Sequence, residues 1–399
     1  MLKPVGSRCN MACQYCYYQE KGNALLSEQL LEEFTRQYLE AQTMPQVLFT
    51  WHGGEPLLRP LSFYRKALEL QRRYGQGLQI DNCIQTNGTL LTDEWCEFLR
   101  ENNFLVGISI DGPEHLNILR SYHASSHLSP HTSPPSSHTS HLSLHTPFHD
   151  IMGGIGLLNK HGVQWNAMAT VNAANADYPV EFYRFFRDID CQFLQFTPVV
   201  EKGERIEERG KRREDRGERK EECITPQQWG RFLCSVYDEW VRRDVGKIFV
   251  QLFDATLANW VGEPPGVCSM APTCGHAAVM EADGSVYSCD HFVFPEYRLG
   301  NIKKMTLTAM LYGERQLHFG RQKRDALPRQ CRECEFLFAC NGECPKNRFI
   351  NDCYGEPGLN YLCEGYRQFF AHVAADMEFM AAELRVGRAP ANIMTQAGR

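Results

Sequence analysis

The chain has 399 residues, of which 43% are hydrophobic and 23% charged, so it can bury one large domain with a smaller one, or two of medium size. Its formal net charge of -6 provides no general basic field, which argues against nucleic acid as a partner. It shows no basic start followed by an apolar run and no stretch of about 18 apolar residues, so we expect a cytoplasmic protein that does not span a membrane.

Short β-rich runs alternate with amphipathic helical segments through the first 260 residues. After an initial LKPVGS, the runs are 47–51, 81–86, 105–110, 165–171, 192–197 and 248–253. A helix is indicated after Ser27, with Leu30, Leu31 and Phe34 on one face, and a capping box is indicated at Thr225. The alternation predicts parallel βα units, which form either an open doubly wound sheet or a full or partial barrel.

Two stretches interrupt this alternation and are predicted to be flexible insertions. The first, 121–147, lies in a His/Ser/Pro-rich stretch with too few large apolar groups to offset the entropy of ordering. Its histidines also permit a metal-binding tract. The second, 201–222, is charged at 18 of 22 positions, nine acidic and nine basic. A solvated loop or an exposed helix with many ion pairs is expected there.

Three cysteines near the start of the chain form a C-x3-C-x2-C array: Cys9, Cys13 and Cys16. A closed tetrahedral metal site needs four ligands, so three thiols leave one position open. In a reducing compartment, clustered cysteines more often bind metal or carry redox chemistry than form disulfides. Five scattered cysteines are instead expected to be small buried hydrophobes. These are Cys83, Cys96, Cys191, Cys223 and Cys234.

Nine further cysteines lie between residues 268 and 363, after a Gly/Pro-rich break near residue 263 that predicts a domain boundary. Among them, MEADGSVYSCD alternates around Asp283 and Gly284 as a tight β-hairpin does. The nine are Cys268, Cys274, Cys289, Cys331, Cys334, Cys340, Cys344, Cys353 and Cys363. Zinc ribbons also use C-x2-C pairs, so a structural zinc is the alternative, but the odd ligand count of the first array favours iron–sulfur chemistry.

The first array, with Tyr15 before its last cysteine, resembles the signature of radical S-adenosylmethionine (radical SAM) enzymes. In that family three thiolates hold a 4Fe–4S cluster, and S-adenosylmethionine chelates the open iron. GGEP (53–56), QTNGT (85–89) and SIDGP (109–113) follow successive predicted strands, at the face where α/β barrels place their sites. The resemblance implies a partial (β/α)6 TIM-like barrel and a set of residues that line the cofactor. They are Tyr15, Gly54, Ser109, Arg120 and Val200.

The carboxy-terminal cysteines resemble a SPASM domain with a β-hairpin and a C-terminal helix. Apart from the two insertions, almost the whole chain is similar to the anaerobic sulfatase-maturating enzymes, in words such as KPVGSRCNMACQYCYY, GSVYSCDHFVFPEYRLGNI and CRECEFLFACNGECPKNR. The resemblance implies three 4Fe–4S clusters in all. One auxiliary cluster would be held by Cys268, Cys274, Cys289 and Cys344, and the other by Cys331, Cys334, Cys340 and Cys363. Cys353 is left over, although it could change places with Cys363 in this assignment.

Such enzymes oxidise a Cys or Ser in a sulfatase motif to Cα-formylglycine without oxygen. The resemblance implies hydrogen abstraction from the substrate Cβ by a 5'-deoxyadenosyl radical, then deprotonation and electron loss to an auxiliary cluster. Asp290 occupies the place of the base, and the adjacent cluster thiolate predicts a raised pKa for its carboxyl group. A carboxylate that only orients the cluster is the alternative role. The implied partners are an unfolded or nascent sulfatase polypeptide and an electron donor such as flavodoxin or ferredoxin.

Two other functions are weighed against this one. A SPASM-type enzyme that modifies a ribosomally made peptide, for example by forming a thioether, would share both cluster domains but not the Cys-Asp-x-Phe segment at 289–292. An iron–sulfur electron carrier or redox sensor would have no use for the GGEP and SIDGP words. The predicted division is a barrel over 1–222, a connecting helix and strand over 223–263, a SPASM domain over 264–375 and a helix end with tail over 376–399.

Overall fold

The computed structural model describes residues 1–19, 21–123, 146–201, 222–275 and 277–396. The chain divides into two compact units. Unit 1 comprises residues 1–110, 117–166 and 276–317, and unit 2 comprises residues 111–116, 167–275 and 318–399. Nearly all of both predicted insertions lies outside the described residues, so their flexibility stays a prediction.

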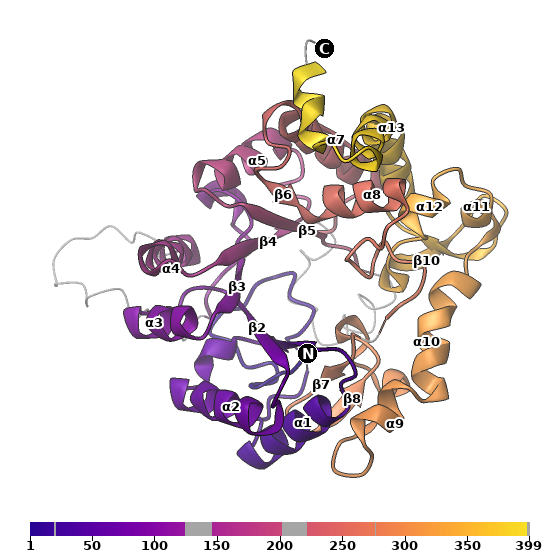
Figure 1. The fold of residues 1–399 in the computed structure, drawn as a ribbon. Coiled ribbons are helices and arrows are strands. Elements are labelled where there is room, and N and C mark those ends of the chain that lie inside the picture. Colours follow the sequence, from indigo (N-terminus) through magenta and orange to yellow (C-terminus); the bar gives the residue numbers. More distant parts are fainter. Residues whose placement is uncertain (20, 124–145, 202–221, 276, 397–399) are drawn as a thin grey trace. The chain divides into compact units, whose positions relative to one another are not determined.

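Unit 1 contains three parallel strands that pair in chain order. They are β1 (Gln46–Trp51), β2 (Gln79–Thr86) and β3 (Phe104–Ser109). In β1 the buried Val47, Phe49 and Trp51 alternate with more exposed residues, which is the period of a strand with one face in the core. The helices that accompany these strands in the unit are α1 (Glu28–Glu40), α2 (Leu61–Tyr74), α3 (Asp93–Glu101) and α4 (Pro147–His161). Of these, α1 and α2 lie side by side (Figure 1).

The predicted start of α1 is confirmed. The Ser27 hydroxyl accepts the Leu30 backbone N–H at 3.2 Å, which satisfies one of the free N–H groups of the first turn. Leu30, Leu31 and Phe34 are buried on the face that the sequence indicated. A second, antiparallel sheet of unit 1 contains β7 (Val279–Met280), β8 (Ser285–Tyr287) and β9 (Arg298–Asn301).

The predicted hairpin is the β7–β8 pair, and its turn contains Gly284 at φ +87°, a conformation that favours glycine. The 3-10 turns η4 (Asp290–Phe292) and η5 (Pro295–Tyr297) follow β8, and α9 (Leu307–Leu311) follows β9. The hairpin therefore leads directly into the segment that contains the predicted base.

Unit 2 contains β4 (Trp165–Val171) from Ala167 onward, β5 (Phe193–Pro198) and β6 (Phe249–Val250), again parallel and in chain order. Its larger helices are α5 (Pro179–Asp188), α7 (Pro226–Arg243), α8 (Gln251–Val261) and α13 (Cys363–Arg385). The capping box of α7 forms as predicted between Thr225 and Gln228. Figure 1 shows α13 beside α7, and α13 also packs against α8.

The cysteine-rich part of unit 2 consists of short elements. After α10 (Glu314–Asp325) come α11 (Arg329–Arg332), α12 (Leu337–Cys340), β10 (Arg348–Asn351) and β11 (Pro357–Asn360). The last two strands form an antiparallel pair. Short elements with little core of their own are typical of small domains held together by metal or disulfide links.

The expected α/β fold with a partial (β/α)6 barrel is confirmed by these parallel strands and their helices. One predicted strand is largely wrong: the run 248–253 is strand only at Phe249–Val250, and α8 begins at Gln251. A short apolar run fits either a strand or a buried helix end, because periodicity does not separate them. The domain division made from the sequence is not tested by the two units and stays a prediction.

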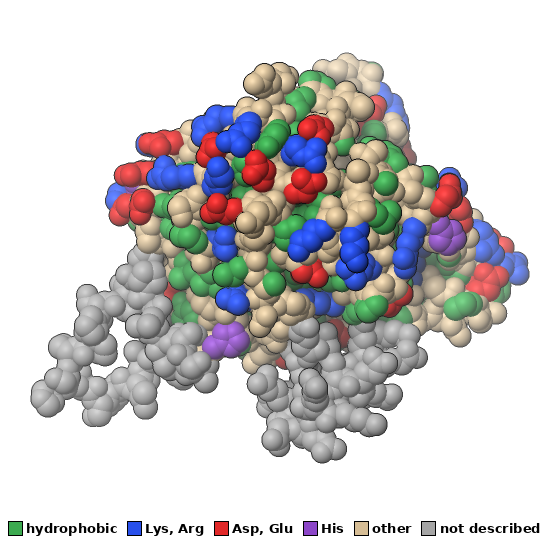
Figure 2. Space-filling model, turned by 90° about the horizontal axis from the view of Figure 1, so that it is seen from below, with side chains coloured by type: hydrophobic (Ala, Val, Ile, Leu, Met, Phe, Trp, Pro, Cys, Tyr) green, Lys and Arg blue, Asp and Glu red, His purple; other side chains and the backbone are tan. Residues whose placement is uncertain are grey.

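The five scattered cysteines are not all buried. Cys96, Cys191 and Cys234 are buried, but Cys83 and Cys223 are only partly so. Cys83 lies in β2, where its thiol contacts the Thr50 hydroxyl at 3.3 Å. On the face seen in Figure 2, Lys/Arg and Asp/Glu side chains are interspersed rather than separated by sign. None of the helices in the described ranges is both long and apolar enough to cross a membrane.

Candidate functional site

The first cysteine array lies in a loop of unit 1 that is fixed by the GGEP turn. Gly54 N–H donates to the Gly6 carbonyl at 2.7 Å, and Glu55 N–H donates to the Arg8 carbonyl at 2.8 Å. A Cβ on Gly54 would lie 1.9 Å from the Arg8 carbonyl oxygen, so only glycine fits this approach. Gly54 thus places bare backbone directly against the segment that leads into Cys9.

The QTNGT turn after β2 contacts the same loop. Asn87 donates to the Asn10 side chain at 2.8 Å and lies 3.8 Å from the Cys9 sulfur. Asn10 in turn donates to the Thr89 hydroxyl at 2.8 Å. Burial, and next the nearby Glu55, raises the pKa of the Cys9 thiol. Because a ligand thiol must be deprotonated, a cluster that binds here releases a proton from Cys9.

A third segment, 119–122, also pairs with the cysteine loop. Backbone bonds of 2.7 and 3.0 Å join the N–H groups of residues 12 and 14 to the carbonyls of residues 121 and 119. This pairing places the Arg120 guanidinium 5.6 Å from the centre of the Tyr15 ring. Both are predicted cofactor residues. Arg120 is 7% exposed, so it lies inside unit 1 although it borders the His/Ser/Pro-rich stretch.

The remaining predicted cofactor residues lie at strand ends. Ser109 ends β3, and its hydroxyl accepts the Gln85 side-chain amide at 2.9 Å. Gln85 covers Gly107, where a Cβ would lie 2.0 Å from its amide oxygen. Val200 is buried after β5 and belongs to unit 2, whereas the other four residues belong to unit 1. The structure therefore groups Tyr15 with Arg120 and places Gly54 at the cysteine loop, while the role of Val200 stays a prediction.

The predicted base, Asp290, lies within unit 1 close to the end of the cysteine loop. The Lys3 ammonium is 2.5 Å from its Oδ1 atom, and the Tyr17 hydroxyl donates to its Oδ2 atom. The sequence predicted a raised pKa for the Asp290 carboxyl group, and this prediction is wrong. Burial acts to raise the pKa of Asp290, but the Lys3 charge holds it well below its usual value.

Sequence reasoning assigned no role to the two residues that complete this group, Lys3 and His52. His52 Nδ1 accepts hydrogen bonds from the Lys3 ammonium at 3.0 Å and from Gly53 N–H at 2.7 Å. A lysine ammonium only donates, so the neutral imidazole carries its proton on Nε2. Burial, reinforced by Lys3, lowers the pKa of His52 to about 3. Lys3 lies in KPVGSRCNMACQYCYY, and His52 directly precedes GGEP. These two motifs carried the resemblance, and they are the signal that could have found both residues.

One proposed auxiliary ligand set lines a single pocket of unit 2, with a volume of about 450 Å³. The thiols of Cys331, Cys334, Cys340 and Cys363 come from α11, the following turn, α12 and the start of α13. Burial, followed by the neighbouring Cys331 and Cys334, raises the pKa of Cys363 to about 12. Four thiols around one cavity fit a four-iron cluster, in which each cysteine binds a different iron. Cys353, predicted to be left over, also lines the pocket and is exposed.

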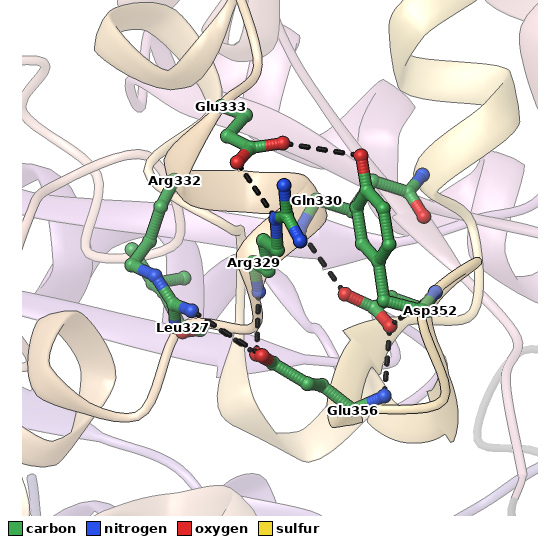
Figure 3. Close-up of polar contacts among 8 residues, drawn as sticks. Leu327, Arg329, Gln330, Arg332, Glu333, Asp352 and Glu356 are labelled. Atoms are coloured by element: carbon green, nitrogen blue, oxygen red, sulfur yellow. Dashed lines mark hydrogen bonds and ion pairs between the residues drawn. The ribbon is translucent and has the colours of Figure 1, made fainter.

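Gln330 and Glu333, which also line this pocket, belong to a polar network (Figure 3). Glu333 accepts from the Arg329 guanidinium at 2.7 Å and from the Tyr354 hydroxyl at 3.1 Å. Asp352 accepts the Gln330 backbone N–H at 3.1 Å. These contacts tie the turn after β10 to the segment with Cys331 and Cys334. The exposed Cys353 is tied to the same segment, because its backbone N–H donates to the Gln330 side chain at 3.1 Å.

The other auxiliary ligand set is divided between the units. Cys289 belongs to unit 1, and Cys268, Cys274 and Cys344 belong to unit 2, so this set stays a prediction. In the described part of the chain, no three His, Cys, Asp or Glu side chains converge as one metal ion requires.

Comparisons with known proteins identify families and enzymes to which this chain is similar. A family model described as the radical SAM superfamily matches residues 4–185, and one described as an iron-sulfur cluster-binding domain, SPASM, matches residues 272–335. A serine-type anaerobic sulfatase-maturating enzyme of Bacteroides thetaiotaomicron is 57% identical, covering 99% of this chain and 94% of the relative. A cysteine-type enzyme of Clostridium perfringens is 30% identical, covering 93% and 95%. A solved structure of native anSMEcpe with bound AdoMet and Cp18Cys peptide matches with a TM-score of 0.80 at 28% identity, covering 96% and 98%.

Proposed function

This chain belongs to the anaerobic sulfatase-maturating enzymes of the radical SAM superfamily, and from that premise we propose how its own residues serve the reaction. The enzyme oxidises a Cys or Ser in a sulfatase active-site motif to Cα-formylglycine without oxygen, and it binds iron–sulfur clusters and S-adenosylmethionine. When bound, these groups supply the radical that removes a hydrogen atom from the substrate Cβ and the acceptor for the second electron.

Serine is the proposed target residue. The observation that carries this choice is the 57% identity to a serine-type enzyme, against 30% to a cysteine-type enzyme, with both alignments covering more than nine tenths of the chain. Abstraction of hydrogen from Cβ leaves the hydroxyl proton to be removed before the aldehyde can form. A base beside the substrate hydroxyl is therefore required.

Asp290 is the proposed base. Its Oδ1 atom is held by the buried Lys3, and its Oδ2 atom accepts the Tyr17 hydroxyl, so the carboxylate is fixed in direction. The nearby cation favours the ionised form, which is the form that accepts a proton. In this role Asp290 takes the proton from the substrate hydroxyl at one of its carboxylate oxygens. A carboxylate that only orients the cluster would leave proton transfer unaffected when it is changed.

The proposed cofactor-binding residues are Tyr15, Gly54, Ser109, Arg120 and Val200. The close backbone approach at Gly54 and the Arg120–Tyr15 contact support it, because both border the cysteine loop. Three 4Fe–4S clusters are proposed, held by the eleven cysteines assigned from the sequence. One of the two auxiliary ligand sets is supported by a pocket whose lining includes Cys331, Cys334, Cys340 and Cys363.

The proposed substrate is an unfolded or nascent sulfatase polypeptide, supported by the peptide bound in the solved relative. An electron donor such as flavodoxin or ferredoxin is proposed because cleavage of S-adenosylmethionine consumes an electron. Location in the cytoplasm stays a prediction from the sequence.

Two peptides that differ only in Ser or Cys at the target position test this function. The reconstituted protein is incubated anaerobically with S-adenosylmethionine, dithionite and each peptide. The masses of the products are then measured by mass spectrometry. We expect the serine peptide to lose two hydrogen atoms and to form an aldehyde that reacts with hydrazines. A faster reaction with the cysteine peptide would overturn the serine assignment, and a crosslinked product without aldehyde would favour the thioether-forming alternative.

A further inference from the structure

A buried lysine holds the loop that contains two predicted ligands of an auxiliary cluster. Lys323, in the last turn of α10, is 1% exposed. Its Nζ atom donates to the carbonyl oxygens of Cys268 at 2.5 Å and Ser269 at 2.7 Å, and also to that of Ala271. All of these residues belong to unit 2. The loop before Cys274 is therefore folded around one side chain.

The three acceptors show that Lys323 is a cation. An ammonium group has three N–H donors and a neutral amine has only two, so three carbonyl partners require the charged form. The acceptors of the Lys323 ammonium are neutral carbonyls, whose dipoles do not cancel its charge. Electrostatically it acts on Cys274, Cys344 and the buried Glu343. Two of these are predicted ligands of one cluster.

A second cation, the half-buried Arg348, holds the turn between Cys340 and Cys344. The three residues of this turn, 341–343, all have positive φ angles, of 48°, 68° and 54°. Their carbonyls accept hydrogen bonds of 2.7 to 3.0 Å from the Arg348 guanidinium, which also donates to the Lys323 carbonyl at 2.5 Å. Arg348 thus connects Lys323, which holds the loop of Cys268 and Cys274, to the turn between Cys340 and Cys344. That turn supplies one predicted ligand to each auxiliary cluster.

We propose that Lys323 and Arg348 are redox-tuning residues, whose positive charges raise the reduction potential of the auxiliary clusters. This inference rests on the proposed ligand sets. A cluster that accepts one electron gains one negative charge and no proton or group, so a nearby cation stabilises the reduced form more than the oxidised form. Charge and hydrogen bonding around the thiolates are the means by which a protein sets this potential. The cations would make the auxiliary clusters competent acceptors for the second electron of the reaction.

The test uses the full chain with Cys9, Cys13 and Cys16 changed to alanine, so that only auxiliary clusters remain. An iron content of about eight per chain must be found first. A lower content would overturn the proposed ligand sets and this inference with them. The Lys323→Met variant is then titrated with dithionite in the presence of mediators, and the reduced clusters are followed by electron paramagnetic resonance. We expect the midpoint potential of one cluster to move to a more negative value.

Arg324→Met is the matched control, because Arg324 follows Lys323 on α10 but is exposed and pairs with Asp325. It should leave both potentials unchanged. Lys323→Arg keeps the charge and should shift the potential less than Lys323→Met does. An unchanged potential in Lys323→Met overturns the proposal. If Lys323→Met and Lys323→Gln both lose about four irons, the lysine only builds the loop, and the tuning role is overturned as well.

Discussion

Lys3 and Asp290, which lie far apart in the sequence, form an ion pair in which Nζ lies 2.5 Å from Oδ1. The side chain of Lys3 is fully buried and that of Asp290 is 14% exposed. A charge in such a place is tolerated only with a partner, so each residue constrains the other. The pair joins the first strand-like segment of the chain to the segment that follows the predicted ligand Cys289.

Replacing Lys3 with methionine should uncouple radical formation from product. Methionine fills a similar volume but leaves the Asp290 carboxylate without its cation, so burial raises the pKa of Asp290 and more of it is already protonated when the substrate proton must be removed. We expect formylglycine per 5'-deoxyadenosine to fall by about 10-fold to 100-fold, the usual effect of losing an orienting partner. Lys21→Met is the control, since Lys21 donates to the Val293 carbonyl at 2.8 Å in the same region. Equal coupling in both variants would show that Lys3 is only structural.

Replacing Asp290 with asparagine tests the base directly. The amide keeps the size of the side chain but cannot accept the proton. All iron should be retained and 5'-deoxyadenosine should still form with peptide, while formylglycine falls by about 100-fold or more. Product mass and nucleoside are measured in the same sample. An unchanged product yield would remove Asp290 as the base, and loss of about four irons would assign it to cluster support.

Metal analysis tests the cluster count. Eleven assigned cysteines predict about twelve irons per reconstituted chain, and the Cys9, Cys13 and Cys16 triple alanine variant should hold about eight and leave S-adenosylmethionine intact. Iron and zinc are measured together by mass spectrometry of the metals. About four irons with zinc would replace the auxiliary clusters by a zinc site.

Cys353 and Cys363 line the same pocket, so their exchange in the ligand assignment can be tested by single changes. Cys363 is partly buried at the start of α13, whereas Cys353 is exposed at the rim. We expect Cys353→Ser to keep about twelve irons and Cys363→Ser to keep about eight. The reverse result would exchange the two residues.

His52 should make the folded protein sensitive to acid. Its pKa in the folded protein is about 3, below the ordinary value of 6.5. Between these two pH values the unfolded chain binds more protons than the folded chain, so the free energy of unfolding falls as the pH falls. This loss of stability begins near pH 6.5. Glutamine has an oxygen that can accept the bonds from Lys3 and Gly53 but does not titrate. We expect the melting temperature of His52→Gln to fall less than that of the parent between pH 7 and pH 5. Equal falls would contradict the buried neutral state of His52.

The elements whose causes are local could be predicted from the amino-acid sequence. Ser27 and Thr225 begin helices because a cap needs only the next three residues, and the turn at Gly284 needs only its own backbone freedom. The cysteine spacings and the GGEP motif likewise predicted the family, because each is a short motif that can be recognised in the sequence alone. The run 248–253 shows the limit of such reasoning, since its apolar residues fit a strand or a helix equally well.

The electrostatic surroundings of the site, in contrast, follow from the folded chain. The sequence showed Asp290 beside a predicted thiolate and so indicated a raised pKa, but folding brings Lys3 to the same carboxylate and reverses the direction. The loop around Lys323 is also invisible in the sequence, because its carbonyl acceptors lie in a segment far from α10. Electrostatic energy depends on distance and burial in space, and residues far apart in the chain acquire both only when the chain folds.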